Sequence, residues 1–316
     1  MNWISKLDSP GHISSAINAY NYSIESLRRS EHFSFLMVEV SRSLFDSMNN
    51  IQTAWGTYKI DTGDNELHDT KDFPSMIVET VKEDDRIYLL QSEQIKDFIF
   101  LEPQIMNHDL LRRRGYKPDQ EIEPKLAKEA RGDHKKLVNA YEKYISDQSD
   151  ENKKDTVIKK MGRLLYIVRS NIAHGEKTIY GPDHGAIERN RIVSEKVIPL
   201  QKILIRFLLD RADRKLVVYG TLAPGEVNQN ILSEIEGSWS DCKVNGRIFE
   251  KNGLPYFVWD SNESLKEVHL FFSKKLPASW NRLDQFEGST YKRILIPVTI
   301  DKEICVANVF EENKNY

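Results

Sequence analysis

Cysteine is scarce in this chain of 316 residues: Cys242 and Cys305 are its two copies, and they match no metal-binding spacing and no disulfide framework. No apolar run reaches membrane-spanning length, and the first residues lack the apolar core of a signal peptide. The formal net charge of -3 argues against a general nucleic-acid coat, although a local basic patch would suffice for an RNA site. We therefore expect a cytoplasmic globular protein without membrane segments, metal or cofactor, whose cysteines fill strand interiors.

Apolar periodicity changes near residue 213. Before it, apolar residues recur at three- and four-residue steps, which predicts helices over residues 12–29, 33–48, 75–90, 124–145, 155–173 and 186–209, with surface loops at 64–72 and 147–155. After it, runs rich in Val, Ile, Phe and Tyr predict strands over residues 216–219, 243–249, 256–259, 267–272, 293–299 and 304–310. The pattern predicts an α+β protein, with an all-α domain at residues 1–213 joined without a flexible linker to a strand-rich domain at residues 214–316.

One short helix is expected among these strands. Ser279 can cap its first turn, and Gly288 can end it. Trp280, Leu283 and Phe286 lie at helical spacing and would form its apolar side.

A Gly- and Pro-containing loop follows the apolar run Leu216-Val217-Val218, and a carboxylate comes about sixty residues later. The loop reads Tyr219-Gly220-Thr221-Leu222-Ala223-Pro224-Gly225-Glu226-Val227-Asn228, and the later segment reads Leu283-Asp284-Gln285-Phe286-Glu287-Gly288, followed by Tyr291 and Arg293. Backbone N–H groups in such a loop can hold an anion or oxyanion, and a carboxylate can move protons. The pairing suits acyl-transfer chemistry.

Together these residues resemble the gamma-glutamylcyclotransferase superfamily, in particular its gamma-glutamylamine-type members, whose opening loop reads YGTL-x-x-G-x-x-N. The resemblance implies a mixed β-barrel with a short helix, and a small-molecule gamma-glutamyl substrate converted to 5-oxoproline. Glu287 matches the catalytic glutamate. Tyr219, Gly220, Thr221, Leu222, Tyr291 and Arg293 match the substrate-binding positions.

Other polar residues of this half have simpler interpretations. Each motif alone would be an ordinary strand–loop junction or a solvated helix end; their joint order and separation favour the resemblance. Asp284 is the competing carboxylate, and its place in the pattern suggests hydrogen bonding within the helix and loop. His269 is expected to be structural. In the first half, His134 and His184 are isolated, and we expect both to be exposed.

The helical half has one chemical motif of its own, Arg169 and His174 at the end of a predicted helix. Met161, Leu164, Leu165, Val168 and Ile172 form the apolar stripe of that helix, and Gly175 is a suitable stop. Residues five apart lie about 140° apart around an ideal helix. Arg169 and His174 therefore converge only if the helix end is reshaped or two chains meet.

This segment resembles the motif of HEPN domains, an arginine followed four to six residues later by a histidine. The resemblance implies a homodimer through the helical domain, with Arg169 and His174 as catalytic residues of a metal-independent ribonuclease. The basic cluster Arg112, Arg113 and Arg114 would then contact RNA, although such a run is more often a solvated surface. A histidine at a helix C-terminus is also favourable by the helix dipole alone.

Three hypotheses stay open. In the first, the chain is a gamma-glutamyl enzyme carried on a helical dimerisation domain. In the second, it is a ribonuclease effector of a toxin or defence system, with the cyclotransferase-like domain as sensor or regulator. In the third, it is a non-catalytic scaffold of two binding modules.

Overall fold

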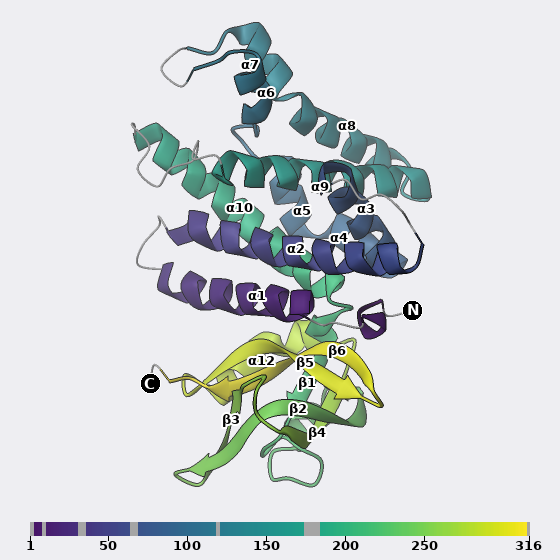
Figure 1. Ribbon diagram of the computed structural model, residues 1–316, viewed down its shortest axis with the longest axis vertical. Helices are drawn as coiled ribbons and strands as arrows, with labels where there is room; N and C mark the ends of the chain where they lie inside the picture. The colour runs from purple at the N-terminus through teal and green to yellow at the C-terminus, as the bar shows by residue number, and fades with distance from the viewer. Residues whose placement is uncertain are drawn as a thin grey trace. The chain divides into compact units, whose positions relative to one another are not determined.

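The computed structural model describes residues 3–7, 11–30, 36–63, 69–117, 121–173 and 184–314. The chain divides into two compact units. Asn18–Leu208 forms the helical unit, and Met1–Ile17 together with Leu209–Tyr316 forms the barrel unit. The domain boundary predicted at residue 213 stays a prediction. The expected α+β class is confirmed, with helices before residue 209 and a mixed barrel after it (Figure 1).

The described helices of the N-terminal part are α1 (Gly11–Ser30), α2 (Leu36–Asp61), α3 (Asp69–Thr80), α4 (Glu83–Gln91), α5 (Glu93–Ile99), α6 (His108–Arg113), α7 (Pro124–Ala130), α8 (Gly132–Ser146), α9 (Glu151–Ala173) and α10 (His184–Leu208). Helix α9 packs against α3 and α8, and α2 packs against α10. The apolar stripe predicted on α9 is confirmed at Met161, Leu164, Leu165 and Val168, which are all buried. Burial of this stripe is the main stabilising contribution of the helix.

Three expectations about helix boundaries are wrong for local reasons. Lys82 has an extended backbone, so the segment predicted as one helix over residues 75–90 is divided into α3 and α4. A break at Arg131 separates α7 from α8. The loop predicted to end at residue 155 ends earlier, because the Asp150 carboxylate accepts hydrogen bonds from the backbone N–H groups of Asn152 and Lys153 and starts α9.

His134 is buried, and the expectation that it is exposed is wrong. Its ring nitrogens lie 2.8 Å from the Ile105 backbone nitrogen and 2.8 Å from the Ile99 carbonyl oxygen. These contacts satisfy both nitrogens, so the ring can leave water without an unpaired polar atom. Burial lowers the pKa of His134, which favours its neutral form.

The barrel unit contains strands β1 (Lys215–Val218), β2 (Ser238–Lys251), β3 (Leu254–Trp259), β4 (Leu265–Phe272), β5 (Tyr291–Ile300) and β6 (Glu303–Glu312). The strand order is β3-β2-β4-β1-β6-β5. A further pairing of β2 with β5, at Lys243 and Thr299, closes the barrel. The β1–β6 pair is parallel and the other pairs are antiparallel. The unit also contains η1 (Ile4–Lys6), η2 (Ala212–Arg214), α11 (Asn230–Ser233) and α12 (Leu276–Glu287).

Alternation along β1 builds two cores, one on each face of the strand. Val217 lies in a cluster with Val244 and Phe257, whereas Leu216 lies in a second cluster with Trp280 and Leu283 of α12. Successive strand residues point to opposite faces, so one short strand serves both clusters. Cys242 and Cys305 belong to the first cluster, as expected for buried thiols in strand interiors.

Helix α12 differs in detail from the predicted short helix. It begins at Leu276, ahead of the predicted cap Ser279, whose hydroxyl donates to the Lys275 carbonyl within the helix. Trp280 and Leu283 are buried, but Phe286 is 43% exposed and does not share the apolar side. Gly288 ends the helix with φ 68°, a left-handed conformation that favours glycine.

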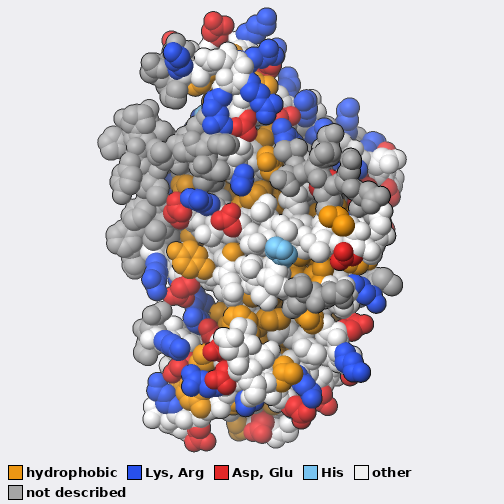
Figure 2. Space-filling model, viewed as in Figure 1, with side chains coloured by type: hydrophobic (Ala, Val, Ile, Leu, Met, Phe, Trp, Pro, Cys, Tyr) orange, Lys and Arg blue, Asp and Glu red, His pale blue; other side chains and the backbone are white. Residues whose placement is uncertain are grey.

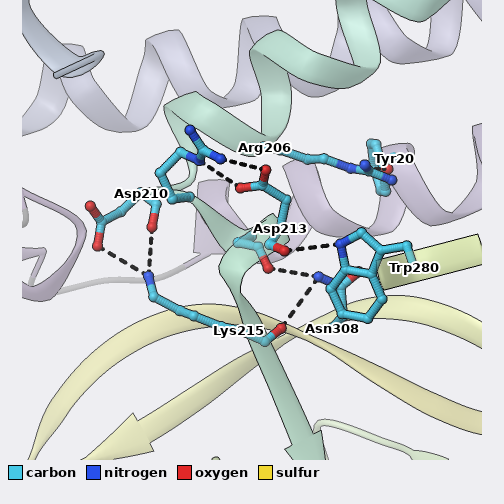
Figure 3. Close-up of polar contacts among 9 residues, drawn as sticks. Tyr20, Arg206, Asp210, Asp213, Lys215, Trp280 and Asn308 are labelled. Atoms are coloured by element: carbon cyan, nitrogen blue, oxygen red, sulfur yellow. Dashed lines mark hydrogen bonds and ion pairs between the residues drawn. The ribbon is translucent and has the colours of Figure 1, made fainter. Parts of the chain in front are cut away.

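A polar cluster fixes the segment that enters β1 (Figure 3). The buried Arg211 guanidinium donates to both carboxylate oxygens of Asp213, at 2.8 and 2.9 Å. The Trp280 indole N–H donates to the Asp213 carbonyl at 2.9 Å, and the Asn308 amide donates to the Ala212 carbonyl at 2.6 Å. These bonds anchor η2 to α12 and β6, and therefore set where β1 begins relative to the end of α12.

Candidate active site

A small cavity of about 30 Å³ lies where β1, α12 and the start of β3 meet. It is lined by Leu216, Val217, Val218, Tyr219, Gly220, Thr221, Leu222, Pro255, Glu287, Tyr291 and Phe310. The loop residues 219–222, Glu287 and Tyr291 are thus brought together from segments about sixty residues apart. Only a small group can enter a cavity of this size without movement of the lining side chains.

The loop after β1 lines this cavity and has unpaired backbone donors. None of the backbone N–H groups of Gly220, Thr221 and Leu222 donates a hydrogen bond within the described residues. Asn228 holds the loop in place: its backbone N–H donates to the Thr221 carbonyl at 2.9 Å, and its side-chain amide donates to the Thr221 hydroxyl at 3.1 Å. Adjacent unpaired N–H groups form an anion-binding surface. The loop is therefore preorganised to hold a carboxylate or an oxyanion.

Gly220 is required by the close approach of another strand. A Cβ atom at this position would lie 2.6 Å from Cγ of Pro255, which real side chains do not tolerate. The glycine thus allows β3 to cover the loop, and Pro255 becomes part of the cavity wall.

Glu287 is the carboxylate of the cavity. It is the last residue of α12 and is half-buried. Burial, with a smaller contribution from the negative charge of Asp284, raises the pKa of Glu287 from 4.5 to about 7. No hydrogen bond or ion pair engages its carboxylate within the described part of the chain. A carboxylate with this pKa can both accept and return a proton near neutral pH.

Two tyrosines form walls of the cavity, and their hydroxyl groups are already engaged. The Tyr219 hydroxyl donates to the Phe310 carbonyl at 2.8 Å, and the Tyr291 hydroxyl donates to the Pro255 carbonyl at 2.9 Å. The Tyr291 ring stacks on Tyr256, with centroids 5.0 Å apart. Burial raises the pKa of Tyr291 to about 12 and raises that of Tyr219 as well, so both are neutral at pH 7. Their rings shape the cavity and desolvate Glu287.

Arg293 does not line the cavity, although the sequence resemblance places it among the substrate-binding residues. Its guanidinium donates to both oxygens of Asp284, at 2.8 and 2.9 Å, and lies 4.3 Å from the ring centroid of Trp280. Asp284 is engaged in hydrogen bonding, as the sequence suggested, but its partner is Arg293 of β5 and not a group of the helix or loop. The pair ties β5 to α12 and positions Glu287 at the end of that helix.

Five lining residues were not among the predicted site residues: Pro255, Phe310 and the β1 residues Leu216, Val217 and Val218. Phe310 comes from the end of β6, and Pro255 lies at the start of β3. Both contribute backbone carbonyls that accept the tyrosine hydroxyls. No local pattern marks them, because their contribution depends on strand pairing.

The motif residues of the helical unit are only partly described. His174 lies outside the described residues, as does Gly175. The half-buried Arg169 guanidinium lies 6.0 Å from the ring centroid of Phe45. Burial raises the pKa of Asp46, and the charges of Arg42 and Arg169 oppose that effect. The HEPN-like assignment, the ribonuclease activity and the dimer stay predictions.

The predicted RNA-binding arginines are not equivalent. Arg112 forms an ion pair with Asp109, and Arg114 forms one with Glu129 at 2.7 Å. Arg113 lies between them and lines a separate cavity of the helical unit.

The described residues contain no group of three or more His, Cys, Asp or Glu side chains placed to hold a metal ion. His269 lies 3.1 Å from the Asp241 carboxylate and against Trp239, which suits the structural role expected for it. Among the helices that the structure describes, none has the length and apolar character that a membrane crossing requires.

Residues 216–315 match the family described as gamma-glutamyl cyclotransferase, AIG2-like. The C-terminal part of the chain thus carries an AIG2-like domain, as the loop and the glutamate predicted. No match was found among curated proteins.

Three solved structures are similar over about a third of the chain. YkqA from Bacillus subtilis is 26% identical, with 32% of this chain and 36% of that chain covered and a TM-score of 0.27. The uncharacterized protein PH0828 from Pyrococcus horikoshii is 18% identical, with coverage of 31% and 76% and a TM-score of 0.25. An AIG2-like protein from Mus musculus is 17% identical, with coverage of 33% and 78% and a TM-score of 0.28. The matched part spans little more than a third of the length of YkqA.

Proposed function

We propose that the barrel unit cyclises a gamma-glutamyl compound to 5-oxoproline and releases the attached amine. The observation that carries the proposal is the pairing of Glu287, whose pKa is raised to about 7, with unpaired N–H groups of the 220–222 loop in one cavity. The match of residues 216–315 to the cyclotransferase family supports the same reaction.

The proposed reaction is an intramolecular acyl transfer. The substrate's alpha-ammonium is unreactive until the Glu287 carboxylate removes a proton from it. The free amine then attacks the gamma-carbonyl, a C–N bond forms, and an oxyanion develops. The loop N–H groups can stabilise that oxyanion or hold the alpha-carboxylate. Glu287 returns its proton to the leaving nitrogen and the original amide bond breaks. The ring nitrogen gives its second proton to the released amine, so 5-oxoproline and the ammonium form of that amine are produced.

The cavity walls contribute by excluding water and by setting the pKa of the base. Tyr219 and Tyr291 present their rings, since their hydroxyls donate to backbone carbonyls. A base with a pKa near the working pH combines a large ionised fraction with sufficient basicity. The described residues that line the cavity include no Lys or Arg, so the substrate carboxylate would rely on backbone donors.

The test is release of 5-oxoproline by the purified full chain from a panel of gamma-glutamyl amines and gamma-glutamyl amino acids, measured by mass spectrometry. Glu287→Gln should abolish product formation, with a loss of at least about a thousandfold. Glu303→Gln is the matched control, because Glu303 is an exposed carboxylate of the same domain. Wild-type protein that releases no 5-oxoproline from any member of the panel would refute the proposal.

For the helical unit, the ribonuclease hypothesis rests on the resemblance of the Arg169–His174 segment alone. It predicts RNA degradation or slowed growth on expression, and loss of either effect in Arg169→Ala and His174→Ala. Toxicity that is unchanged in both variants would exclude it. If neither 5-oxoproline release nor ribonuclease activity is detected and a bound partner is found, the non-catalytic scaffold would be supported.

A further inference from the structure

The helical unit holds a cavity of about 590 Å³ that belongs to neither predicted catalytic site. It is lined by Asn107, Asp109, Leu110, Arg113, Arg114, Asp133, Arg163 and Tyr166, from α6, α8, α9 and the two residues that flank α6. Its volume is within the range of small-molecule sites. Figure 2 shows Lys and Arg side chains gathered over α6, α7 and α8, at the upper end of the view.

The two carboxylates of this cavity are already compensated. Asp109 forms an ion pair with Arg112 and accepts a hydrogen bond from the Ser170 hydroxyl at 2.5 Å. Asp133 accepts hydrogen bonds from Lys136 and from the Asn107 amide, each at 3.4 Å. Both carboxylates of the lining therefore have partners other than Arg113, Arg114 and Arg163.

Two of those arginines have no carboxylate partner among the described residues. Arg114 pairs with Glu129, but neither Arg113 nor Arg163 forms an ion pair within the described ranges. Arg163 is half-buried, and its guanidinium lies 6.0 Å from the ring centroid of Tyr166. A partly desolvated cation without a counter-charge is unfavourable, and an anionic ligand would relieve that cost.

We propose that this cavity binds a small organic phosphate ester. A guanidinium fork matches phosphate oxygens, and two unpaired guanidinium groups match the charge of a phosphomonoester near neutral pH. Tyr166 and Leu110 give the cavity an aromatic and an aliphatic surface beside the cations, which would contact the organic part. The site is independent of the reaction proposed for the barrel unit.

The test uses phenyl phosphate as the probe, with inorganic phosphate and phenol as part-ligands, and isothermal titration calorimetry of the full chain. Saturable binding of one phenyl phosphate per chain is expected, with weaker binding of either part-ligand. Arg113→Gln and Arg163→Lys should each weaken it about tenfold or more, since each removes a charge-assisted contact or its fork geometry.

Arg131→Gln is the matched control, because Arg131 is exposed, lies at the start of α8 and does not line the cavity. Its affinity should equal that of the wild type, and circular dichroism should show the same helix content in all variants. Arg113 is exposed, so its replacement tests binding without disturbing the core.

Absence of saturable binding, or equal affinity in wild type and both cavity variants, would overturn the proposal. Equal affinities for inorganic phosphate and phenyl phosphate would overturn the claim that the cavity also recognises the organic group of the ligand. Binding of a single-stranded RNA oligonucleotide that weakens equally in Arg131→Gln would indicate an extended polyanion surface in place of a small-ligand site.

Discussion

Replacing Glu287 with glutamine should stabilise the protein above neutral pH while it removes activity. In the folded protein the pKa of Glu287 is raised from 4.5 to about 7, chiefly by burial. On unfolding the side chain enters water and regains its ordinary pKa. The folded state therefore binds the proton more tightly, and its stability falls as the pH rises from about 4.5 to about 7.

The size of the effect follows from the shift. One pKa unit corresponds to about 1.4 kcal/mol, so ionised Glu287 costs the folded state at most about 3 kcal/mol at pH 8. At pH 5 the side chain is protonated in the folded protein, and the same linkage gives a loss of folding stability of less than about 1 kcal/mol. Glutamine is neutral at every pH and of similar shape. The stability difference between the variant and the wild type should therefore grow from pH 5 to pH 8.

The assay is urea unfolding at both pH values, followed by tryptophan fluorescence, because Trp239, Trp259 and Trp280 all lie in the barrel unit. Glu303→Gln again serves as control and should match the wild type at both pH values. A Glu287→Gln protein that is no more stable than the wild type at pH 8 would refute the reasoning, since Glu287 would then be as well solvated as a surface carboxylate. The same pKa predicts that kcat/KM falls about tenfold per pH unit below about 7.

Other predictions concern packing and assembly. Gly220→Ala should lower kcat/KM at least about tenfold and destabilise the barrel unit by about 1–3 kcal/mol, measured by kinetics and thermal unfolding, because its Cβ would meet Pro255; unchanged values would show that β3 can move away. Arg293→Lys should lower the free energy of unfolding, measured by thermal unfolding, by about 1–2 kcal/mol through loss of the bidentate bond to Asp284, yet leave the pH dependence of kcat/KM unchanged. A shift in the pH at which kcat/KM falls on the acid side would indicate that Arg293 acts directly on Glu287. Ile4→Ala should lower the free energy of unfolding by about 2–4 kcal/mol, since this side chain is 1% exposed and its element η1 contacts β6. A loss below about 1 kcal/mol would contradict that packing. Light scattering at micromolar concentration should give a dimer, and a monomer would count against a composite Arg169–His174 site.

The sequence predicted elements whose determinants are local. The stripe on α9 places Met161, Leu164, Leu165 and Val168 in the core, and alternation in the second half located every strand to within a few residues, except β2, which begins five residues earlier than predicted. The loop after β1 and Glu287 could be recognised as a pair because each has a distinctive local sequence. Their meeting at one cavity then depends on the barrel, which brings the end of α12 to the end of β1.

What escaped prediction depends on partners distant in the sequence. The Tyr291 hydroxyl bonds to a carbonyl 36 residues away, and that of Tyr219 to one 91 residues away, so neither Pro255 nor Phe310 could be recognised as part of the site. Arg293 has the sequence position of a substrate-binding residue, but Asp284 and Trp280 engage its guanidinium. His134 looked isolated because its two partners are backbone groups 29 and 35 residues away.

The assignment of Met1–Ile17 to the same compact unit as Leu209–Tyr316 has a consequence for synthesis. Trp3 and Ile4 are made before the helical unit, but the strand β6 on which η1 packs is made after it. Translation of the intervening helical unit, about 190 residues at ~5–20 residues per second, takes roughly 10–40 s. During that time the helical unit can fold on the ribosome, whereas these early apolar side chains have no barrel to join. The barrel unit can complete its fold only when both of its segments, Met1–Ile17 and Leu209–Tyr316, have been made, so it acquires its native structure after the helical unit.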